Sequence, residues 1–111
     1  MPKAIWNDVV IAESTNTVMV EGNHYFPPNS VNQTYFKKNS QTTVCPWKGT
    51  ASYYDIEVDG KVNKGAAWYY PNPSKAASNI KNHIAFYGSV KIVKSEGEPG
   101  GILDRIKSLF S

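Results

Sequence analysis

A chain of 111 residues, 41% of them apolar and 13% aromatic, fits one globular domain with its own core and excludes an intrinsically disordered protein. Twelve basic residues against nine acidic ones give a net charge of +3, which falls short of the basic stripe of a sequence-specific nucleic-acid binder. The single cysteine excludes an internal disulfide, and because neither a signal peptide nor a run of about 20 apolar residues is present, we expect a cytoplasmic protein without a membrane span.

The first half of the chain reads as short strands separated by turns. Asn7-Asp8 marks a tight hairpin turn, since Asn and Asp tolerate the positive φ that two-residue turns need. Pro27-Pro28 ends a later strand, because proline lacks the backbone donor that a sheet ladder requires. We expect strands over residues 4–6, 9–12, 17–20, 24–26 and 34–37, followed by a polar loop over residues 38–43.

The clearest hairpin turns at Asp59-Gly60. A two-residue loop would pair Glu57 with Val62 and so mix polar and apolar side chains on one face. A three-residue loop with the glycine in a left-handed bulge keeps the two faces separate. It predicts Glu57 opposite Lys61 on the outside and Ile56 opposite Val62 in the core.

The last third of the chain begins with a short helix and ends in a segment of different composition. Pro73 fits the first turn of a helix that we expect over residues 74–81, with Asn72 as its N-cap. Glycine, glutamate and proline dominate residues 95–101, which predicts a linker after a β-rich domain of residues 1–94. Strands are expected over residues 84–87 and 90–93.

Residues 102–111 carry an amphipathic helical pattern, with apolar side chains on one face and charged ones on the other. A helix this short is marginal alone in water, so we expect its apolar stripe to dock on its own domain, on a second copy in a homodimer, or on a protein partner. A membrane surface is the weaker alternative, because the segment has few cations. The stripe consists of Ile102, Leu103, Ile106, Leu109 and Phe110.

The densest chemistry lies in the run Cys-Pro-Trp-Lys-Gly. A thiol is a strong nucleophile only as thiolate, and a nearby ammonium stabilises the thiolate, so Cys45 and Lys48 are candidate catalytic residues. Cys–His catalysis would also need a base, and only His24 and His83 are available. The alternative is a structural role, in which Cys45 is a small buried hydrophobe, Trp47 a core ring and Lys48 a solvated surface charge.

A second cluster of rings follows in the run Ala-Ala-Trp-Tyr-Tyr. Because side chains alternate along a strand, Trp68 and Tyr70 share one face and Tyr69 takes the other. These rings either pack a core or, together with Trp47 and Tyr53, line a ligand pocket in which the hydroxyls act as polar handles. One Cys and two His do not complete a closed zinc site, and no phosphate-binding glycine loop is present, so we expect no metal and no cofactor.

Three motifs follow the opening hairpin Trp6 to Ser14: Thr43-x-Cys45-Pro46-Trp47-Lys48-Gly49-x-Ala51-x-Tyr53, Ala66-Ala67-Trp68-x-Tyr70-x-x-Pro73 and Ile84-Ala85-Phe86-Tyr87. Together they resemble a bacterial family, domain of unknown function 427, which is also described as nucleotidyltransferase-like. The resemblance implies a compact antiparallel β domain, of a two-sheet tent-like or small-barrel kind, and no established activity. Nucleotidyltransferases hold a metal with paired carboxylates beside a phosphate-binding turn. We interpret the alternating Asp55, Glu57 and Asp59 of this chain as a solvated face instead.

The sequence thus predicts an all-β or β-dominated fold: a small antiparallel two-sheet domain, tent-like or a partly open barrel, with one short helix and a C-terminal amphipathic helix. It favours a binding module with an aromatic pocket near Cys45 and Lys48 for a small anionic or carbonyl ligand. The alternatives are an enzyme with Cys45 as nucleophile, or a protein that docks on a partner or a membrane through its C-terminal helix. Scattered lysines and the lone Arg105 favour no specific nucleic-acid binding. The ligand-binding candidates are Trp47, Tyr53, Trp68 and Tyr70.

Overall fold

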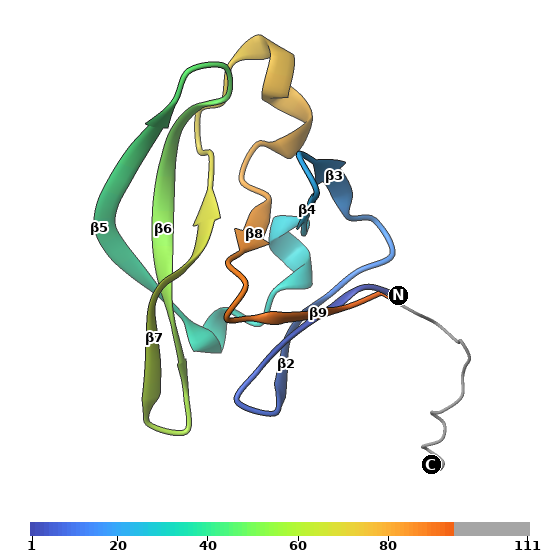
Figure 1. Ribbon diagram of the computed structural model, residues 1–111, viewed down its shortest axis with the longest axis vertical. Coiled ribbons are helices and arrows are strands. Elements are labelled where there is room, and N and C mark those ends of the chain that lie inside the picture. Colours follow the sequence, from blue (N-terminus) through green and yellow to red (C-terminus); the bar gives the residue numbers. More distant parts are fainter. Residues whose placement is uncertain (95–111) are drawn as a thin grey trace.

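The computed structural model describes residues 1–94, which form nine strands in three antiparallel sheets (Figure 1). The β-dominated antiparallel class is confirmed, with three sheets where two were expected and no closed barrel among the described residues. The predicted linker (95–101) and C-terminal helix (102–111) lie outside the described residues.

The strands are β1 (Lys3–Trp6), β2 (Val9–Glu13), β3 (Val18–Val20), β4 (Asn23–Tyr25), β5 (Phe36–Cys45), β6 (Gly49–Val58), β7 (Lys61–Tyr69), β8 (Ile84–Phe86) and β9 (Lys91–Val93), and the 3-10 helices are η1 (Pro28–Ser30), η2 (Gln33–Tyr35) and η3 (Lys75–Ile80). The strands are ordered β5-β6-β7-β8, β2-β1-β9 and β3-β4 in the three sheets.

The chain opens with the predicted hairpin, formed by β1 and β2. Asn7 and Asp8 have φ of 51° and 63°, as a two-residue turn of this hand requires. The Asn7 side chain also donates a hydrogen bond of 3.1 Å to the carbonyl of Val58, which ties this turn to the end of β6. Because β9 pairs with the other side of β1, the first and last described strands are neighbours in one sheet.

The register predicted for the hairpin of β6 and β7 is wrong. Asp59 and Gly60 alone form the turn, with φ of 51° and 79°, and Glu57 pairs with Val62 rather than with a lysine. Val62 is 49% exposed, whereas Ile56 is fully buried. The turn decides the pairing, because left-handed φ at both of its residues matches the twist of the strands. One exposed valine at a hairpin tip is ordinary in a protein surface.

The polar segment predicted as a loop, residues 38–43, is instead part of the long strand β5. It pairs with β6, interrupted by a bulge between Asn39 and Thr42. The Asn39 side chain holds this bulge, since its amide donates to Asp55 and its oxygen accepts from the backbone N–H of Gln41, both over 2.7 Å. As the edge of its sheet, β5 is mostly exposed, so its sequence lacks the apolar alternation that marks a half-buried strand.

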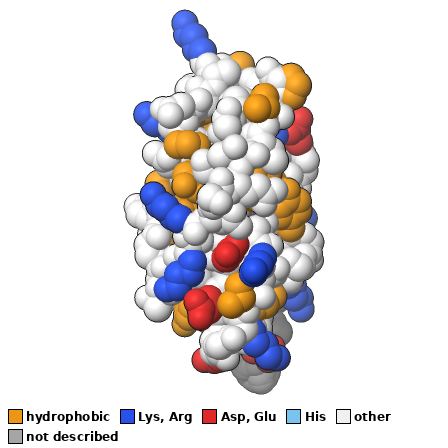
Figure 2. Space-filling model, turned by 90° about the vertical axis from the view of Figure 1, so that its left-hand side faces the viewer, with side chains coloured by type: hydrophobic (Ala, Val, Ile, Leu, Met, Phe, Trp, Pro, Cys, Tyr) orange, Lys and Arg blue, Asp and Glu red, His pale blue; other side chains and the backbone are white. Residues whose placement is uncertain are grey.

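Figure 2 looks onto the side of the molecule that carries β5. Basic and acidic side chains are interspersed on this face, with polar and apolar surface between them, and the basic ones form no continuous stripe there. This side of the domain therefore lacks the electrostatic pattern by which a protein tracks a phosphate backbone.

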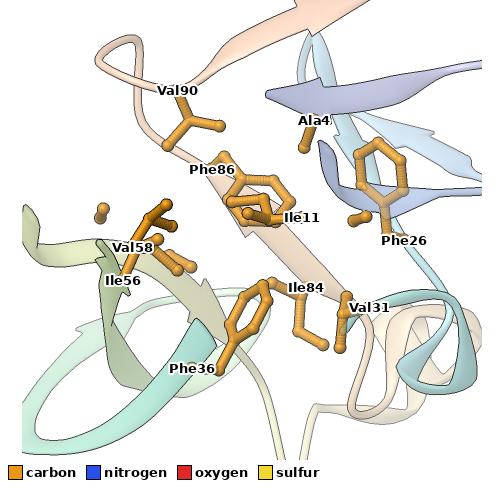
Figure 3. Close-up of a cluster of buried hydrophobic side chains, with 13 residues drawn as sticks. Ala4, Ile11, Phe26, Val31, Phe36, Ile56, Val58, Ile84, Phe86 and Val90 are labelled. Carbon is orange, nitrogen blue, oxygen red and sulfur yellow. The ribbon is translucent and has the colours of Figure 1, made fainter. Parts of the chain in front are cut away.

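The main core lies between the four-stranded sheet and the sheet of β2, β1 and β9 (Figure 3). Three phenylalanine rings stand near its centre, with the Phe86 centroid 5.6 Å from that of Phe26 and 6.0 Å from that of Phe36. Tilted and edge-to-face ring pairs of this kind add to the stabilisation that burial provides. Aliphatic side chains fill the space around the rings: Ile11, Val31, Ile56, Val58, Ile84 and Val90.

A second apolar cluster lies on the opposite face of the four-stranded sheet. Tyr53 and Ala85 belong to it, while their chain neighbours Tyr54 and Phe86 pack on the main core side, as strand alternation requires. The separate sheet of β3 and β4 lies beside β8, because the residue after β4 exchanges two backbone hydrogen bonds of 2.8 Å with the first residue of β8. We call this second cluster the aromatic face. It comprises Tyr25, Ala51, Tyr53, Tyr70, Ala77, Ile80 and Ala85, with Val18, Val20, Cys45 and Trp68 packed against them.

The helix predicted over residues 74–81 is the 3-10 helix η3, which covers part of the aromatic face with its buried residues. Its cap position is Ser74 rather than Asn72, and the Ser74 hydroxyl donates to the carbonyl of Trp47 instead of capping the helix. Another 3-10 turn, η2, precedes β5, so that strand starts at Phe36, two residues later than expected. Within residues 1–94, the structure has no helix with the length and apolar character needed to cross a membrane.

Candidate functional site

The loop from Pro46 to Lys48 joins β5 to β6, and its flanking residues Cys45 and Gly49 pair with each other. Gly49 has φ of +117°, a conformation that residues with a side chain rarely adopt. A Cβ at this position would lie 3.3 Å from the carbonyl oxygen of Asn72. The backbone N–H and the hydroxyl of Ser74 donate to two carbonyls of the loop, over 2.9 and 2.6 Å. The loop is therefore held closely against the segment that precedes η3.

The ammonium of Lys48 lies inside this arrangement, and the residue is only 6% exposed. Its Nζ donates to Oε1 of Glu21, a residue of the turn between β3 and β4. The same nitrogen is 5.5 Å from the ring centroid of Tyr70 and 5.6 Å from that of Trp47, within range of a cation–π attraction. The Trp47 indole donates from Nε1 to Oε2 of the same Glu21 carboxylate over 3.1 Å. One carboxylate thus joins two donors from adjacent residues.

The alternative in which Trp47 is a core ring and Lys48 a solvated charge is wrong for both residues. Trp47 is 43% exposed, and Lys48 is buried. Lys48 can be buried because its charge is paired with Glu21, a residue 27 positions away in the sequence. Cys45, which that alternative expects to be buried, is half-buried and packs against the aromatic face.

The ion pair changes the titration of both partners. Burial acts to lower the pKa of Lys48, but the hydrogen bond to Glu21 and the nearby tyrosine hydroxyls raise it above its ordinary value. Hydrogen bonds from Lys48 and Trp47 lower the pKa of Glu21 below 4.5. Because the folded state binds the Glu21 proton more weakly than the unfolded chain does, this contribution to stability is present above pH 4.5 and is lost as the pH falls through the lower folded value.

Trp68 and Tyr70 share a face, as predicted, and both belong to the aromatic face. The Trp68 indole donates over 3.1 Å to the hydroxyl of Tyr25, which is fully buried. The hydroxyls of Tyr53 and Thr43 form a hydrogen bond of 2.7 Å. Burial raises the pKa of Tyr70, while the neighbouring lysine ammonium acts in the opposite direction. The cluster therefore combines apolar rings with hydroxyls that are already hydrogen-bonded or charge-stabilised.

Tyr87 stands at the exposed end of this cluster, with 48% of its surface in solvent. Its ring centroid is 4.7 Å from that of Trp68, and it stacks on Tyr53 at 6.5 Å. A hydrogen bond with the Tyr53 hydroxyl and, to a smaller extent, burial raise the pKa of Tyr87 to about 12. Sequence reasoning misses Tyr25, Tyr87 and Glu21 as site residues. Only Tyr87 carries a signal, because it ends one of the family motifs, whereas Glu21 reads as an ordinary turn residue.

Of the predicted site residues, the structure brings Cys45, Tyr53, Trp68 and Tyr70 together on the aromatic face. Lys48 reaches this group through its ammonium over Tyr70, and the exposed Trp47 ring stands at the edge of the group. Residues 1–94 enclose no pocket, and because Tyr53, Tyr70 and Lys48 are buried, the exposed surface at this site comes from other side chains such as Trp47. Within the same residues, no three His, Cys, Asp or Glu side chains gather in a way that could hold a metal ion.

Asp55, Glu57 and Asp59, the three alternating acidic residues, differ in their surroundings. Asp55 accepts hydrogen bonds from Asn39 and from the backbone N–H of Gly65, over 2.7 and 2.8 Å, and so supports the bulges on both sides of β6. Glu57 faces a valine across the hairpin, and Asp59 is in the turn. These positions explain the carboxylates without a phosphoryl-transfer site.

Cys45 is expected to react slowly with alkylating agents in the native protein. Its side chain packs against the aromatic face, and neither histidine hydrogen-bonds to it: His24 bonds to Thr17 over 2.9 Å and His83 to the carbonyl of Lys81 over 3.0 Å. Cys–His catalysis needs a base within hydrogen-bond reach of the thiol, which neither histidine provides here. Mass spectrometry should show iodoacetamide labelling about tenfold slower in buffer than in guanidinium at the same pH. Equal rates in the two conditions would contradict the half-buried placement.

The comparison with family models confirms the family that the sequence resembles. No curated protein matches the chain. One family model matches residues 2–96, which include every described strand and the whole of the site. The chain therefore belongs to the family described as domain of unknown function 427 (DUF427).

Proposed function

We propose that this domain is a binding module that holds a small anionic or carbonyl ligand on the aromatic face beside Lys48. The observation that carries the proposal is the buried ammonium, whose partner Glu21 has 53% of its side chain exposed. A charge taken out of water costs free energy that an ion pair only partly recovers, so its retention here favours a role beyond packing. In the proposal, Lys48 anchors a ligand oxygen through a charge-assisted hydrogen bond.

The rings around the ammonium supply the rest of the proposed recognition surface. Trp47 offers an exposed ring, and Trp68, which is half-buried on the aromatic face, adds apolar area. Tyr53 and Tyr70 are almost fully buried, so in the proposal they support these side chains from within the aromatic face rather than contact a ligand. A ligand with one anionic or carbonyl oxygen on a planar apolar body has a complement for each of its parts.

Cys45 has a lining role in this proposal. A nucleophilic role has less support, because Lys48 is already paired with Glu21 and the hydrogen bonds of both histidines go elsewhere. As a small apolar side chain packed against the aromatic face, Cys45 contributes contact area to a ligand rather than a covalent bond.

Ligand titrations of the full chain test the proposal. Small carboxylates, phosphates and cyclic amides are added in turn, and binding is followed by tryptophan fluorescence and by amide chemical shifts. We expect one of these classes to bind, with shifts centred on residues 47–49 and 70. Lys48→Met keeps the apolar stem and removes the charge, so it should weaken binding about 10- to 100-fold.

Lys81→Met is the matched control, because Lys81 is an exposed lysine of the same charge. It should leave the affinity unchanged. The proposal fails if none of the three classes binds, or if Lys48→Met and Lys81→Met bind the ligand equally well.

A further inference from the structure

We infer that Glu21 occupies this site as an internal ligand, and that a free organic carboxylate binds by displacing it. The inference rests on the proposed function and deepens it, because it names the ligand class and the residue that competes with the ligand. It requires that the two donors on the Glu21 carboxylate stay in place when that carboxylate leaves.

The donors match a carboxylate in number and spacing. Lys48 Nζ donates a hydrogen bond to Oε1 of Glu21 and Trp47 Nε1 donates one to Oε2, so each oxygen has one donor. Both donors belong to one short loop, and Ser74 donates two hydrogen bonds to the backbone carbonyls of that loop. A planar group with two oxygens fits this pair in the way that Glu21 does, whereas a single carbonyl oxygen would leave one donor without a partner.

The two sides of the contact differ in how firmly they are held. Lys48 is 6% exposed, whereas the Glu21 side chain is 53% exposed. Glu21 and Gly22 form a two-residue turn, with φ of 53° and 81°, at the tip of the hairpin of β3 and β4. When Glu21 turns away, its carboxylate regains water, but the ammonium remains among rings and needs another anion. Displacement is therefore favourable only for a ligand that brings an anionic group of its own.

The surface beside the ion pair adds a preference for the body of the ligand. The exposed Trp47 ring lies next to the ammonium, at 5.6 Å from Nζ to the ring centroid. An aromatic acid such as benzoate places its carboxylate between the donors and its ring on apolar surface. Inorganic phosphate and chloride bring charge without that contact area, so they should compete poorly.

Chemical rescue of a Glu21→Ala variant tests this inference. The full chain is melted with increasing sodium benzoate, with sodium chloride keeping the ionic strength constant. We expect Glu21→Ala to melt below the wild type without benzoate and to regain stability as benzoate rises. Its affinity for benzoate should exceed that of the wild type by about tenfold or more, because no internal carboxylate competes. Tryptophan fluorescence should change over the same concentration range.

Glu13→Ala is the matched control, since Glu13 is a surface glutamate paired with Lys3 at 3.8 Å on another sheet. It makes the same change in charge and should show no rescue by benzoate. Glu21→Ala combined with Lys48→Met should also lose the rescue. If Glu21→Ala does not fold, Glu21→Gln provides the same comparison, with a weaker competitor in place of the carboxylate.

The outcomes separate the two proposals. If the wild type binds a ligand through Lys48 but removal of the Glu21 carboxylate does not raise the affinity for benzoate, the internal-ligand role is wrong and the binding module stands. If neither the wild type nor the Glu21 variants bind any anion or carbonyl compound, both proposals are wrong. Rescue by chloride or phosphate as effective as rescue by benzoate would overturn the assignment to organic carboxylates.

Discussion

Replacing Phe86 by alanine is expected to lower the free energy of unfolding by about 3–5 kcal/mol. The Phe86 ring is 5% exposed and contacts two further phenylalanine rings in the main core, so its loss leaves a cavity that the surrounding strands close only in part. Domains of this size are stable by about 5–15 kcal/mol in total. The melting temperature, followed by circular dichroism, should therefore fall by about 20 °C.

Two further variants separate packing from other causes. Phe86→Leu keeps most of the volume and should lose clearly less stability than the alanine variant. Val44→Ala removes an apolar side chain that is 78% exposed on the edge strand, and should change stability by about 0.5 kcal/mol or less. If Phe86→Ala and Val44→Ala melted at the same temperature, the three-ring core would not hold the sheets together as described.

Local turn chemistry predicts where both hairpins turn, but it does not predict the loop length or the register of the second. Asn7-Asp8 and Asp59-Gly60 adopt the left-handed φ values that their residue types favour. The assumption that Val62 must be buried led to a three-residue loop, and the structure exposes this valine instead. A register inferred from apolar pattern fails near a hairpin tip, because side chains there extend beyond the core that would select the face.

Strand β5 shows a different limit of sequence reasoning. Its middle, Lys-Asn-Ser-Gln-Thr-Thr, is polar at every position and reads as a loop. The segment is a strand because β6 offers it backbone partners on both sides of the bulge, while its outer edge remains in solvent. Neither side of such a strand needs apolar residues, so the information that makes it a strand lies in β6 rather than in its own sequence.

The site could be located from sequence, but its arrangement could not. The motif of Cys45 to Gly49 and the alternation of Trp68, Tyr69 and Tyr70 point to the residues that gather on the aromatic face, with Tyr69 on the other side of the sheet. The burial of Lys48 depends on Glu21, a distant residue without any motif of its own. Sequence spacing does not reveal a single long-range pair, so only the structure shows that Lys48 is buried and Trp47 is exposed.

Gly49→Ala is expected to destabilise the domain by about 2–3 kcal/mol and to weaken ligand binding at Lys48 together with stability. The cause is specific to this position: φ is +117°, and the added Cβ would meet backbone atoms of Asn72, which a side-chain rotation does not relieve. Gly60→Ala also places a side chain at positive φ, 79°, but with nothing within 4 Å, so it should cost about 1 kcal/mol. Gly88→Ala has open space and no positive φ, and should be close to neutral. Urea melts of the three variants give this order directly. If Gly49→Ala costs no more than Gly60→Ala, the loop that carries Lys48 shifts freely, and the donors are not held in place as the proposed displacement of Glu21 requires.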